Sequence, residues 1–368
     1  MKHAIFILIL GSILFSGCEK SLLTTEFSDT PVDNFEALWH EFDIGYGAMV
    51  AKKLNWDSLK LVYGSKVNNS SSDYELYFAM CGLLHEINDG HTDLKASGIA
   101  FFRSWNRRDK SFYVDSYTRS MEDVGKHLKI IRNYYLNNSY ASVEAEGWNF
   151  FYGTVEVNQK KIGYLYIPTF SLDHFPDAFI QSAVDDFQLL DAVIIDLRFN
   201  GGGNTESFVK TLNRFASEPK VFLKSKYRNG PLHNDFSEMF EHRIRPHDDC
   251  LKNKPVAILM NSYTASSSEH FILGMRSQKG VITVGDTTCG AFSSVNERLL
   301  PNGWCFRIGG QVVYTPEGNL LVDSKGRYLE GIGLSPDYYA PDHWEPLQLH
   351  HDVPLDKAIE KLTLDEFN

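Results

Sequence analysis

Apolar residues recur at spacings of three and four along residues 34–46, the pattern of an amphipathic helix. Polar helix-start residues at 55–58 predict a second helix. Residues 73–87 predict a third helix, which ends in the turn sequence Asn88-Asp89-Gly90. We therefore expect a small helical domain over residues 33–95.

From residue 149 onward, short apolar runs alternate with segments of helical period. The runs are rich in β-branched residues, which is typical of buried strands. This alternation predicts an α/β core at residues 151–345 and a C-terminal helix within 346–368. Residues 96–150 show no clear period and are interpreted as a connecting segment. The expected strands are 162–167, 191–197, 255–260 and 281–284, and the expected helices are 175–190, 205–215, 264–275 and 355–362.

The N-terminus has the composition of an export signal. Lys2 supplies a positive charge, and residues 4–15 are an apolar stretch too short to span a bilayer as a helix. Small residues then precede Cys18, an arrangement similar to a bacterial lipobox. We expect residues 1–18 to be a lipoprotein signal peptide ending at the lipidated Cys18, and residues 19–32 to be a tether. The protein would then be anchored in the outer membrane, facing the periplasm or the cell surface; a plain signal peptide is the alternative.

Composition narrows the possible partners. The formal net charge is −11 and the basic residues are scattered, which argues against a nucleic-acid partner. The four cysteines other than Cys18 allow three pairings, and the sequence does not choose between them. No CxxC pair is present, and His85-Glu86 lacks the second histidine of a zinc helix because Asp89 stands in its place. We predict neither a metal nor another cofactor.

Two segments at predicted strand ends carry candidate chemistry. Residues 261–269 are rich in serine and precede a helix, where free N–H groups favour a developing oxyanion. Helix capping by the same hydroxyls is the alternative explanation. Residues 201–203 are three glycines, which let the backbone approach a ligand closely. A dinucleotide loop fits less well, because Glu206 takes the place of the last glycine of GxGxxG.

Four motifs, in the same order along the chain, resemble those of the C-terminal processing peptidases, the S41 serine peptidases. The resemblance covers roughly residues 33–345, although 96–150 matches poorly and is too short for the PDZ domain common in that family. It implies a ClpP/crotonase-like spiral core of ββα units, a small N-terminal helical domain and a peptide or protein substrate. The motifs are the helical part that ends in Asp89-Gly90-His91, the segment Asp196–Gly203, the segment Val256–Glu269 with Val284–Thr288, and Glu330–Asp337.

The resemblance also implies which residues form the site. When the motifs are aligned on Glu269, the family nucleophile falls on Ser266. The oxyanion donors of the family fall on the backbone N–H groups of Gly202 and Ser267. A serine hydroxyl is a weak nucleophile at neutral pH, so it needs an adjacent base.

The identity of the base depends on the branch of the family. The processing peptidases use a lysine, and Ala291 stands at that position, so a Ser–Lys dyad is excluded. The tricorn-like branch, found in exported bacterial proteins, uses a histidine helped by a serine and a glutamate. His91 and Glu330 resemble the histidine and the glutamate, whereas Gly90 replaces the helper serine. Because histidine has a suitable pKa, we predict a serine endopeptidase with a Ser266–His91–Glu330 site.

Two other functions stay open at this point. A degenerate relative that binds peptides or other ligands without cleaving them is favoured by the replacements at Gly90 and Ala291. An esterase-like hydrolase could use the same serine and oxyanion donors, but no GxSxG motif is present.

Overall fold

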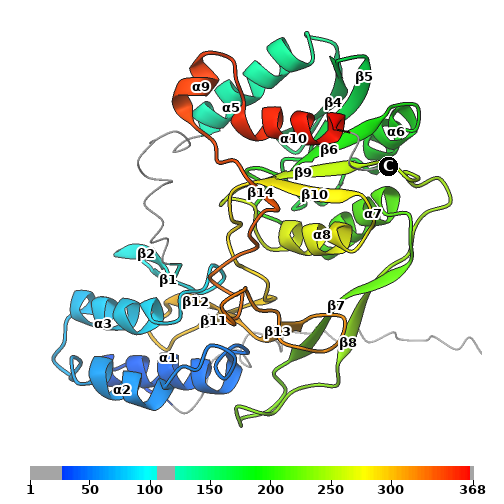
Figure 1. Ribbon diagram of the computed structural model, residues 1–368. Coiled ribbons are helices and arrows are strands. Elements are labelled where there is room, and N and C mark those ends of the chain that lie inside the picture. The colour runs from blue at the N-terminus through cyan, green and yellow to red at the C-terminus, as the bar shows by residue number, and fades with distance from the viewer. Residues whose placement is uncertain (1–26, 106–120, 365–368) are drawn as a thin grey trace, which may run out of the picture.

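The computed structural model describes residues 27–105 and 121–364. The predicted signal peptide with Cys18, and the predicted tether up to residue 26, lie outside the described residues. Figure 1 shows a lower part of helices and short strands, and an upper part in which helices surround a central sheet. Within the described residues, no helix has the length and apolar character needed to cross a membrane.

The three N-terminal helices expected from the sequence are confirmed. They are α1 (Pro31–Gly45), α2 (Trp56–Gly64) and α3 (Asp73–His85). Helix α1 starts within the segment predicted as a tether, because Thr30 caps it and proline is well suited to the first helical position. Its apolar face packs into the main core, where the Phe42 and Phe306 rings lie 5.7 Å apart.

The central sheet has seven strands in the order β14-β10-β9-β6-β5-β4-β3. Strands β5, β6, β9, β10 and β14 are parallel, and β3 and β4 add antiparallel strands at one edge. Every residue of β6 and β9 is buried, which explains their uninterrupted apolar sequences. The strands are β3 (Tyr140–Ala145), β4 (Trp148–Val157), β5 (Lys160–Tyr166), β6 (Ala192–Asp196), β9 (Val256–Met260), β10 (Val281–Gly285) and β14 (Tyr338–Tyr339).

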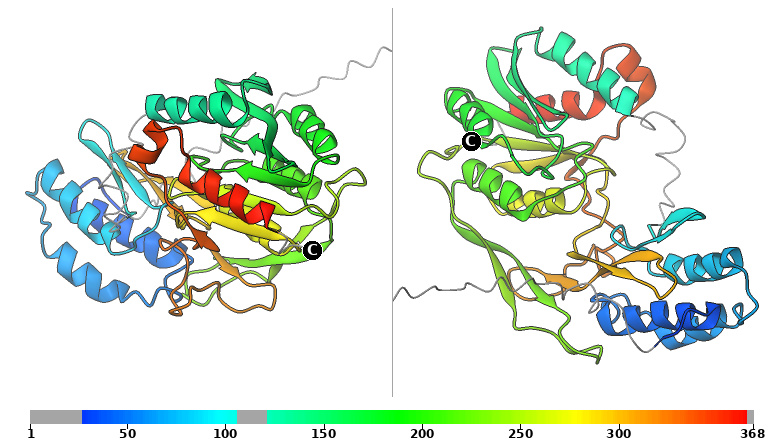
Figure 2. Two further views of the ribbon diagram at one scale, coloured as in Figure 1. Left: turned by 45° about the horizontal axis from the view of Figure 1, so that its top comes forward. Right: turned by 180° about the vertical axis from the view of Figure 1, so that it is seen from behind.

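Helices cover both faces of this sheet, as Figures 1 and 2 show. One layer packs on one face through a core that includes Phe187, Leu212 and Phe271, and it consists of α6 (Asp177–Phe187), α7 (Thr205–Phe215) and α8 (Ser267–Arg276). A second core lies on the opposite face, under α5 (Met121–Ile130), its π-helical extension η1 (Ile131–Tyr135) and α10 (Val353–Thr363). The short helix α9 (Trp344–Gln348) precedes α10. The predicted α/β class and its alternating strands and helices are confirmed.

Two smaller sheets were not expected from the sequence. The first has the order β11-β12-β1-β2 and consists of β1 (Asp93–Ala96), β2 (Ala100–Arg103), β11 (Val295–Leu299) and β12 (Cys305–Gly309). The second has the order β13-β7-β8 and consists of β7 (Lys220–Tyr227), β8 (Phe240–Ile244) and β13 (Gln311–Tyr314). Because β1 pairs with β12, the segment after α3 is joined to a distant part of the chain.

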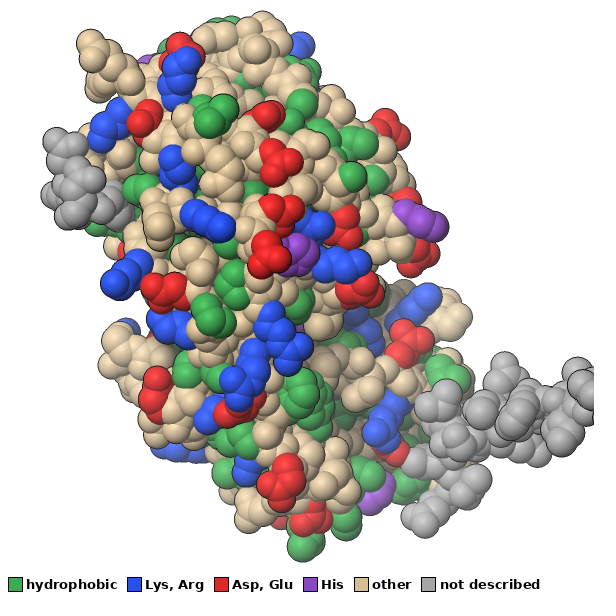
Figure 3. Space-filling model, turned by 90° about the vertical axis from the view of Figure 1, so that its right-hand side faces the viewer, with side chains coloured by type: hydrophobic (Ala, Val, Ile, Leu, Met, Phe, Trp, Pro, Cys, Tyr) green, Lys and Arg blue, Asp and Glu red, His purple; other side chains and the backbone are tan. Residues whose placement is uncertain are grey.

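The distribution of charged side chains and the state of the cysteines can be followed in the structure. On the face shown in Figure 3, acidic and basic side chains are interspersed without a basic stripe. Four cysteines lie within the described residues, and all of them are free thiols: Cys81, Cys250, Cys289 and Cys305.

Candidate active site

Ser266 lies at the turn between β9 and α8, as expected. Its backbone has φ 57° and ψ −121°, a sparsely populated conformation for a residue with a side chain. Ser266 is partly exposed, whereas Ser267 and Ser268 beside it are buried. The Ser267 hydroxyl is also engaged, because it donates to the carbonyl of Gly203 at 2.6 Å. The turn therefore presents one serine of this group to the solvent side, at the N-terminus of a helix.

The carboxylate of Glu269 holds this turn against the next loop. It accepts the N–H of Ser266 at 2.9 Å, the hydroxyl of Thr288 at 2.5 Å, and the N–H groups of Gly290 and Ala291 at 2.7 and 2.8 Å. Burial raises the pKa of Glu269 to about 7, although these hydrogen bonds act in the opposite direction. The loop after β10 is thereby fixed beside the predicted nucleophile.

The glycine loop after β6 reaches the same turn. A Cβ atom on Gly202 would lie 2.7 Å from the Cβ of Ser266, so only glycine fits this close approach. The N–H of Ala265 donates to the carbonyl of Asn200 at 3.1 Å, which ties the two loops together. The N–H of Gly202 donates to Asn200 Oδ1 at 2.9 Å. Of the two predicted oxyanion donors, Gly202 is thus engaged within its own loop, while Ser267 has the first N–H of α8, which has no intrahelical acceptor.

His91 lies beside Glu330, as the sequence motifs suggested, and both lie beside Asp89. One ligand atom from each of these three residues lies within 4.8 Å of the other two. The backbone N–H of His91 donates to Asp89 at 2.7 Å, and its ring atom Nδ1 is buried without a hydrogen-bond partner in the described part of the chain. Burial lowers the pKa of His91. Within the described residues no hydrogen bond joins His91 to Ser266.

Glu330 and Asp89 form a buried acid pair. Glu330 accepts the N–H groups of Phe292 and Ser293, each at 3.1 Å, and Asp89 accepts the hydroxyl of Tyr46 at 2.8 Å. Burial, and next the charge of Asp89, raise the pKa of Glu330 well above its ordinary value. The charge of Lys52, whose ammonium donates to the carbonyls of Ile87 and Asn88, acts on the pKa of Glu330 in the opposite direction.

The loop that follows β10 is consequently held from both sides. Its residues 290 and 291 donate to Glu269, and its residues 292 and 293 donate to Glu330. The loop therefore connects the turn of Ser266 to the acid pair beside His91 through four backbone N–H groups. This arrangement depends on the tertiary structure, because the two carboxylates are far apart in the sequence.

The two positions that depart from the family pattern face each other. A Cβ atom on Gly90 would lie 3.2 Å from the Cβ of Ala291 and 3.0 Å from Cys289 Sγ. Ala291 is almost fully buried. The space that a helper serine and a lysine would need is therefore small and lined by apolar or weakly polar atoms.

Sequence reasoning missed two residues of this region, Asp89 and His270. Asp89 was considered as part of a turn, as part of the motif Asp89-Gly90-His91 and as a position that lacks a zinc-binding histidine, but not as a site residue, although its place next to a candidate base was a usable signal. His270 is in the first turn of α8, and its N–H donates to the carbonyl of Ser266 at 3.1 Å. Burial lowers the pKa of His270 to about 3, with further contributions from His242 and His91, so its ring is neutral.

Among residues 27–105 and 121–364, two groups of side chains have the composition of metal ligands, and protein donors contact the carboxylates of both. In the Asp89–His91–Glu330 group, the carboxylates accept backbone and tyrosine donors. In the group formed by His127, Asp342 and Asp352, the guanidinium of Arg198 lies 2.9 and 2.8 Å from the two carboxylates.

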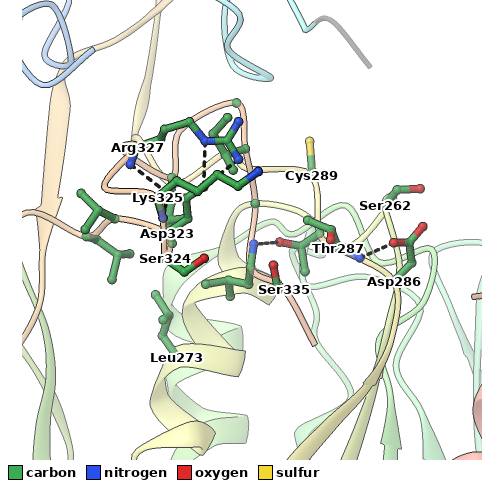
Figure 4. Close-up of a pocket in the computed structure, with 18 of the residues that line it drawn as sticks. Ser262, Leu273, Asp286, Thr287, Cys289, Asp323, Ser324, Lys325, Arg327 and Ser335 are labelled. Carbon is green, nitrogen blue, oxygen red and sulfur yellow. Dashed lines mark hydrogen bonds and ion pairs between the residues drawn. The ribbon is translucent and has the colours of Figure 1, made fainter. Parts of the chain in front are cut away.

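A pocket of about 790 Å³ is lined in part by the loop after β10. Figure 4 shows Thr287 and Cys289 of this loop on one side, and Lys325 and Arg327 on another. Arg327 forms an ion pair with Asp323 at 2.7 Å. Ser262, from the turn between β9 and α8, lines this pocket, whereas Ser266 does not.

The comparison with protein families decides the identity of this core. Residues 161–340 match the family model described as "Peptidase family S41". This range contains both the loop of Gly202 and the turn of Ser266. This core, residues 161–340, belongs to peptidase family S41. The predicted relationship to this family is thereby confirmed, and its members include named proteases.

This S41 protein resembles carboxy-terminal processing proteases in sequence. It is 26% identical over 213 residues to carboxy-terminal processing protease CtpB of Bacillus subtilis. The match covers 56% of this chain and 42% of CtpB, so it spans less than half the length of that relative. The similarity therefore covers the core of the protein.

Solved structures confirm the expected S41-type fold. A candidate peptidase of Parabacteroides merdae has a TM-score of 0.74 and 27% identity, with 92% of this chain and 98% of that chain covered. Mature CPAF has a TM-score of 0.63 and 13% identity, with 90% and 97% covered, and shows a likeness of fold alone. The assignment to the tricorn-like branch stays a prediction.

Proposed function

We propose that this S41 protein is a serine endopeptidase that forms an acyl-enzyme on Ser266. The observation that carries the proposal is the backbone of Ser266, held at φ 57° at the N-terminus of α8, with its side chain partly exposed. Strained backbone of this kind is typical of functional residues, and a helix N-terminus stabilises negative charge. Membership of a peptidase family supports the reaction class.

In the proposed reaction, Ser266 Oγ attacks the carbonyl carbon of the scissile peptide bond. Its proton passes to His91, and the tetrahedral oxyanion accepts hydrogen bonds from the N–H groups of Ser267 and Gly202. The Gly202 N–H would have to turn from Asn200 or be shared with it. His91 then protonates the leaving amine as the peptide C–N bond breaks, and water hydrolyses the resulting ester by the same steps in reverse order.

The proposed role of His91 is supported by its surroundings. Its lowered pKa keeps the ring neutral at pH 7, the form that a general base needs. Asp89 and Glu330 lie close enough to stabilise the imidazolium that forms during the reaction. The hydrogen bond to Ser266 would form when substrate is bound, since such contacts often tighten only in the Michaelis complex.

A fluorophosphonate probe tests the nucleophile directly. Wild-type protein should be labelled at Ser266, and Ser266→Ala should abolish labelling while leaving the circular dichroism spectrum unchanged. Ser268→Ala is the matched control, because Ser268 is buried two residues further along the chain and should be dispensable for labelling. Labelling that persists in Ser266→Ala and disappears in Ser268→Ala would contradict the assignment.

A peptide-binding protein without peptidase activity is the second candidate. It is favoured by the contact between Gly90 and Ala291 and by the lack of a hydrogen bond between His91 and Ser266 within the described residues. Saturable binding of unstructured peptides, without probe labelling and without cleavage on long incubation, would support this candidate over the peptidase.

We also propose that the protein is an exported lipoprotein anchored through Cys18. The support is the sequence of residues 1–18 alone. Wild-type protein should partition into the detergent phase and carry acyl chains at Cys18, while Cys18→Ala should not. Mature protein that is processed at another position and stays in the aqueous phase would rule out the anchor.

A further inference from the structure

Phe199 has a backbone conformation that is unusual for a large side chain. Its φ is 68°, in the left-handed region that favours glycine. Such conformations persist only where neighbouring residues impose them, and they cluster at binding and catalytic sites. Phe199 stands between Arg198 and Asn200, which are both completely buried.

The neighbours of Phe199 impose this conformation through charged and polar contacts. Arg198 forms ion pairs with Asp196 at 2.7 Å and Asp352 at 2.8 Å. Asn200 donates from its side chain to the carbonyl of Ile167 at 3.0 Å. With the residues on both sides fixed in the interior, the chain is forced to turn outward at Phe199, which is partly exposed.

The ring of Phe199 lies beside the ring of Tyr263. Their centroids are 6.0 Å apart at an interplanar angle of 45°. Tyr263 is 37% exposed. His127, from α5, lies against another side of Phe199 with its centroid 5.7 Å away in an edge-on arrangement. Phe199 is therefore supported by His127 on one side while the Phe199–Tyr263 pair still has an accessible surface.

Phe199 and Tyr263 belong to the two segments that form the proposed reaction centre, the loop of Gly202 and the turn of Ser266. Phe199 and Tyr263 follow β6 and β9, which are adjacent parallel strands. Ligands of parallel α/β sheets bind at the carboxyl ends of the strands. Phe199 comes three residues before Gly202, and Tyr263 comes three residues before Ser266. Gly202 and Ser266 approach closely, because a Cβ atom placed on Gly202 would lie 2.7 Å from the Cβ of Ser266.

We propose that Phe199 and Tyr263 form an aromatic shelf that binds an apolar, preferentially aromatic, side chain of the peptide substrate near the scissile bond. The inference rests on the proposed peptidase function and adds a substrate preference to it. Two rings at this separation offer a flat apolar surface with the edge and face contacts that aromatic side chains favour. An anionic side chain placed on these ring faces would lose hydration and meet their negative π surfaces.

The test is a cleavage profile on a library of unstructured peptides, with cleavage positions read by mass spectrometry. Wild-type protein should show, at one position flanking the cleaved bond, at least about a tenfold preference for aromatic over small residues, in line with pocket discrimination in enzymes. Phe199→Gly should reduce this ratio several-fold, because glycine accepts the φ of 68° and only the ring is lost. Tyr263→Ala should act in the same direction, and Tyr263→Phe should retain the preference.

Tyr74→Ala is the matched control, because it removes an exposed tyrosine from α3, outside the proposed site. Its profile should equal that of wild type. The proposal is overturned if wild-type protein cleaves without preference, or if both Phe199→Gly and Tyr263→Ala retain the wild-type ratio. If Phe199→Gly fails to fold, Tyr263→Ala decides alone. Absence of fluorophosphonate labelling at Ser266 in wild type would instead refute the proposed function, so the two failures are distinguishable.

Discussion

Gly90 and Ala291 face each other at the proposed site, with only 3.2 Å between a built Cβ on Gly90 and the Cβ of Ala291. In the family motifs these positions resemble those of a helper serine and a catalytic lysine. Because the two positions are in contact, a larger side chain at either of them would extend into the space beside the other. In the proposed mechanism the base for Ser266 therefore comes from outside this region, and His91 beside the acid pair is our candidate.

Ala291→Lys tests whether this region can accept the lysine of the processing peptidases. Ala291 is 2% exposed and its N–H donates to Glu269, so a lysine would be overpacked and its charge poorly hydrated. We expect a loss of about 2 kcal/mol or more in the free energy of unfolding, measured by chemical denaturation, and no gain in peptidase activity. A stable and more active Ala291→Lys protein would contradict this account.

His91→Ala should reduce kcat/KM for peptide cleavage by about 10² to 10⁴, the contribution typical of a general base. The matched control is His270→Gln, which removes the other buried imidazole near Ser266. His270→Gln should change the rate far less. The opposite order of effects would transfer the role of base from His91 to His270.

The pH dependence of the reaction follows from the lowered pKa of His91. A base must be neutral to accept a proton, so the rate should rise with pH through the pKa of His91 and then level off. Because burial lowers that pKa, the rise should be centred below the ordinary histidine value of about 6.5. The profile of kcat/KM against pH measures this, and a midpoint clearly above 6.5 would disagree with a buried, neutral His91.

Glu269 should make the protein less stable as pH rises from about 4.5 to 7. Its pKa is raised from 4.5 to about 7, so the folded state binds its proton more tightly than the unfolded state does. The stabilisation is complete below the unfolded pKa and is lost as pH rises through the folded one. Thermal unfolding at pH 5 and pH 7.5 should show a smaller difference in Glu269→Gln than in wild type. An equal difference would mean that Glu269 is ionised throughout this range.

Arg198→Met should destabilise the fold strongly. Arg198 is completely buried and forms ion pairs with Asp196, Asp342 and Asp352, so its removal leaves carboxylates buried without their cation. We expect a loss of about 3–5 kcal/mol in the free energy of unfolding. The control is Arg243→Met, whose ion pair with Glu241 is half exposed and should contribute less than about 1 kcal/mol.

The predicted helices and buried strands were confirmed because their signals are local. The apolar run of β6 and the capped start of α2 depend on neighbouring residues, and periodicity reports such neighbours well. The small sheets could not be predicted in this way. Strand β1 has four residues and pairs with β12, more than two hundred positions later, so no local pattern contains that pairing.

The same distinction between local signals and long-range contacts applies to the proposed site. The sequence motifs alone predicted that Ser266, His91 and Glu330 belong to one site, and the structure places His91 beside Glu330. What only the tertiary structure decided is the surroundings of these residues: Asp89 paired with Glu330, Gly90 packed against Ala291, and the left-handed Phe199 beside Tyr263. Residue types and short-range order are written in the sequence, whereas contacts and pKa values arise from segments that meet only when the chain is folded.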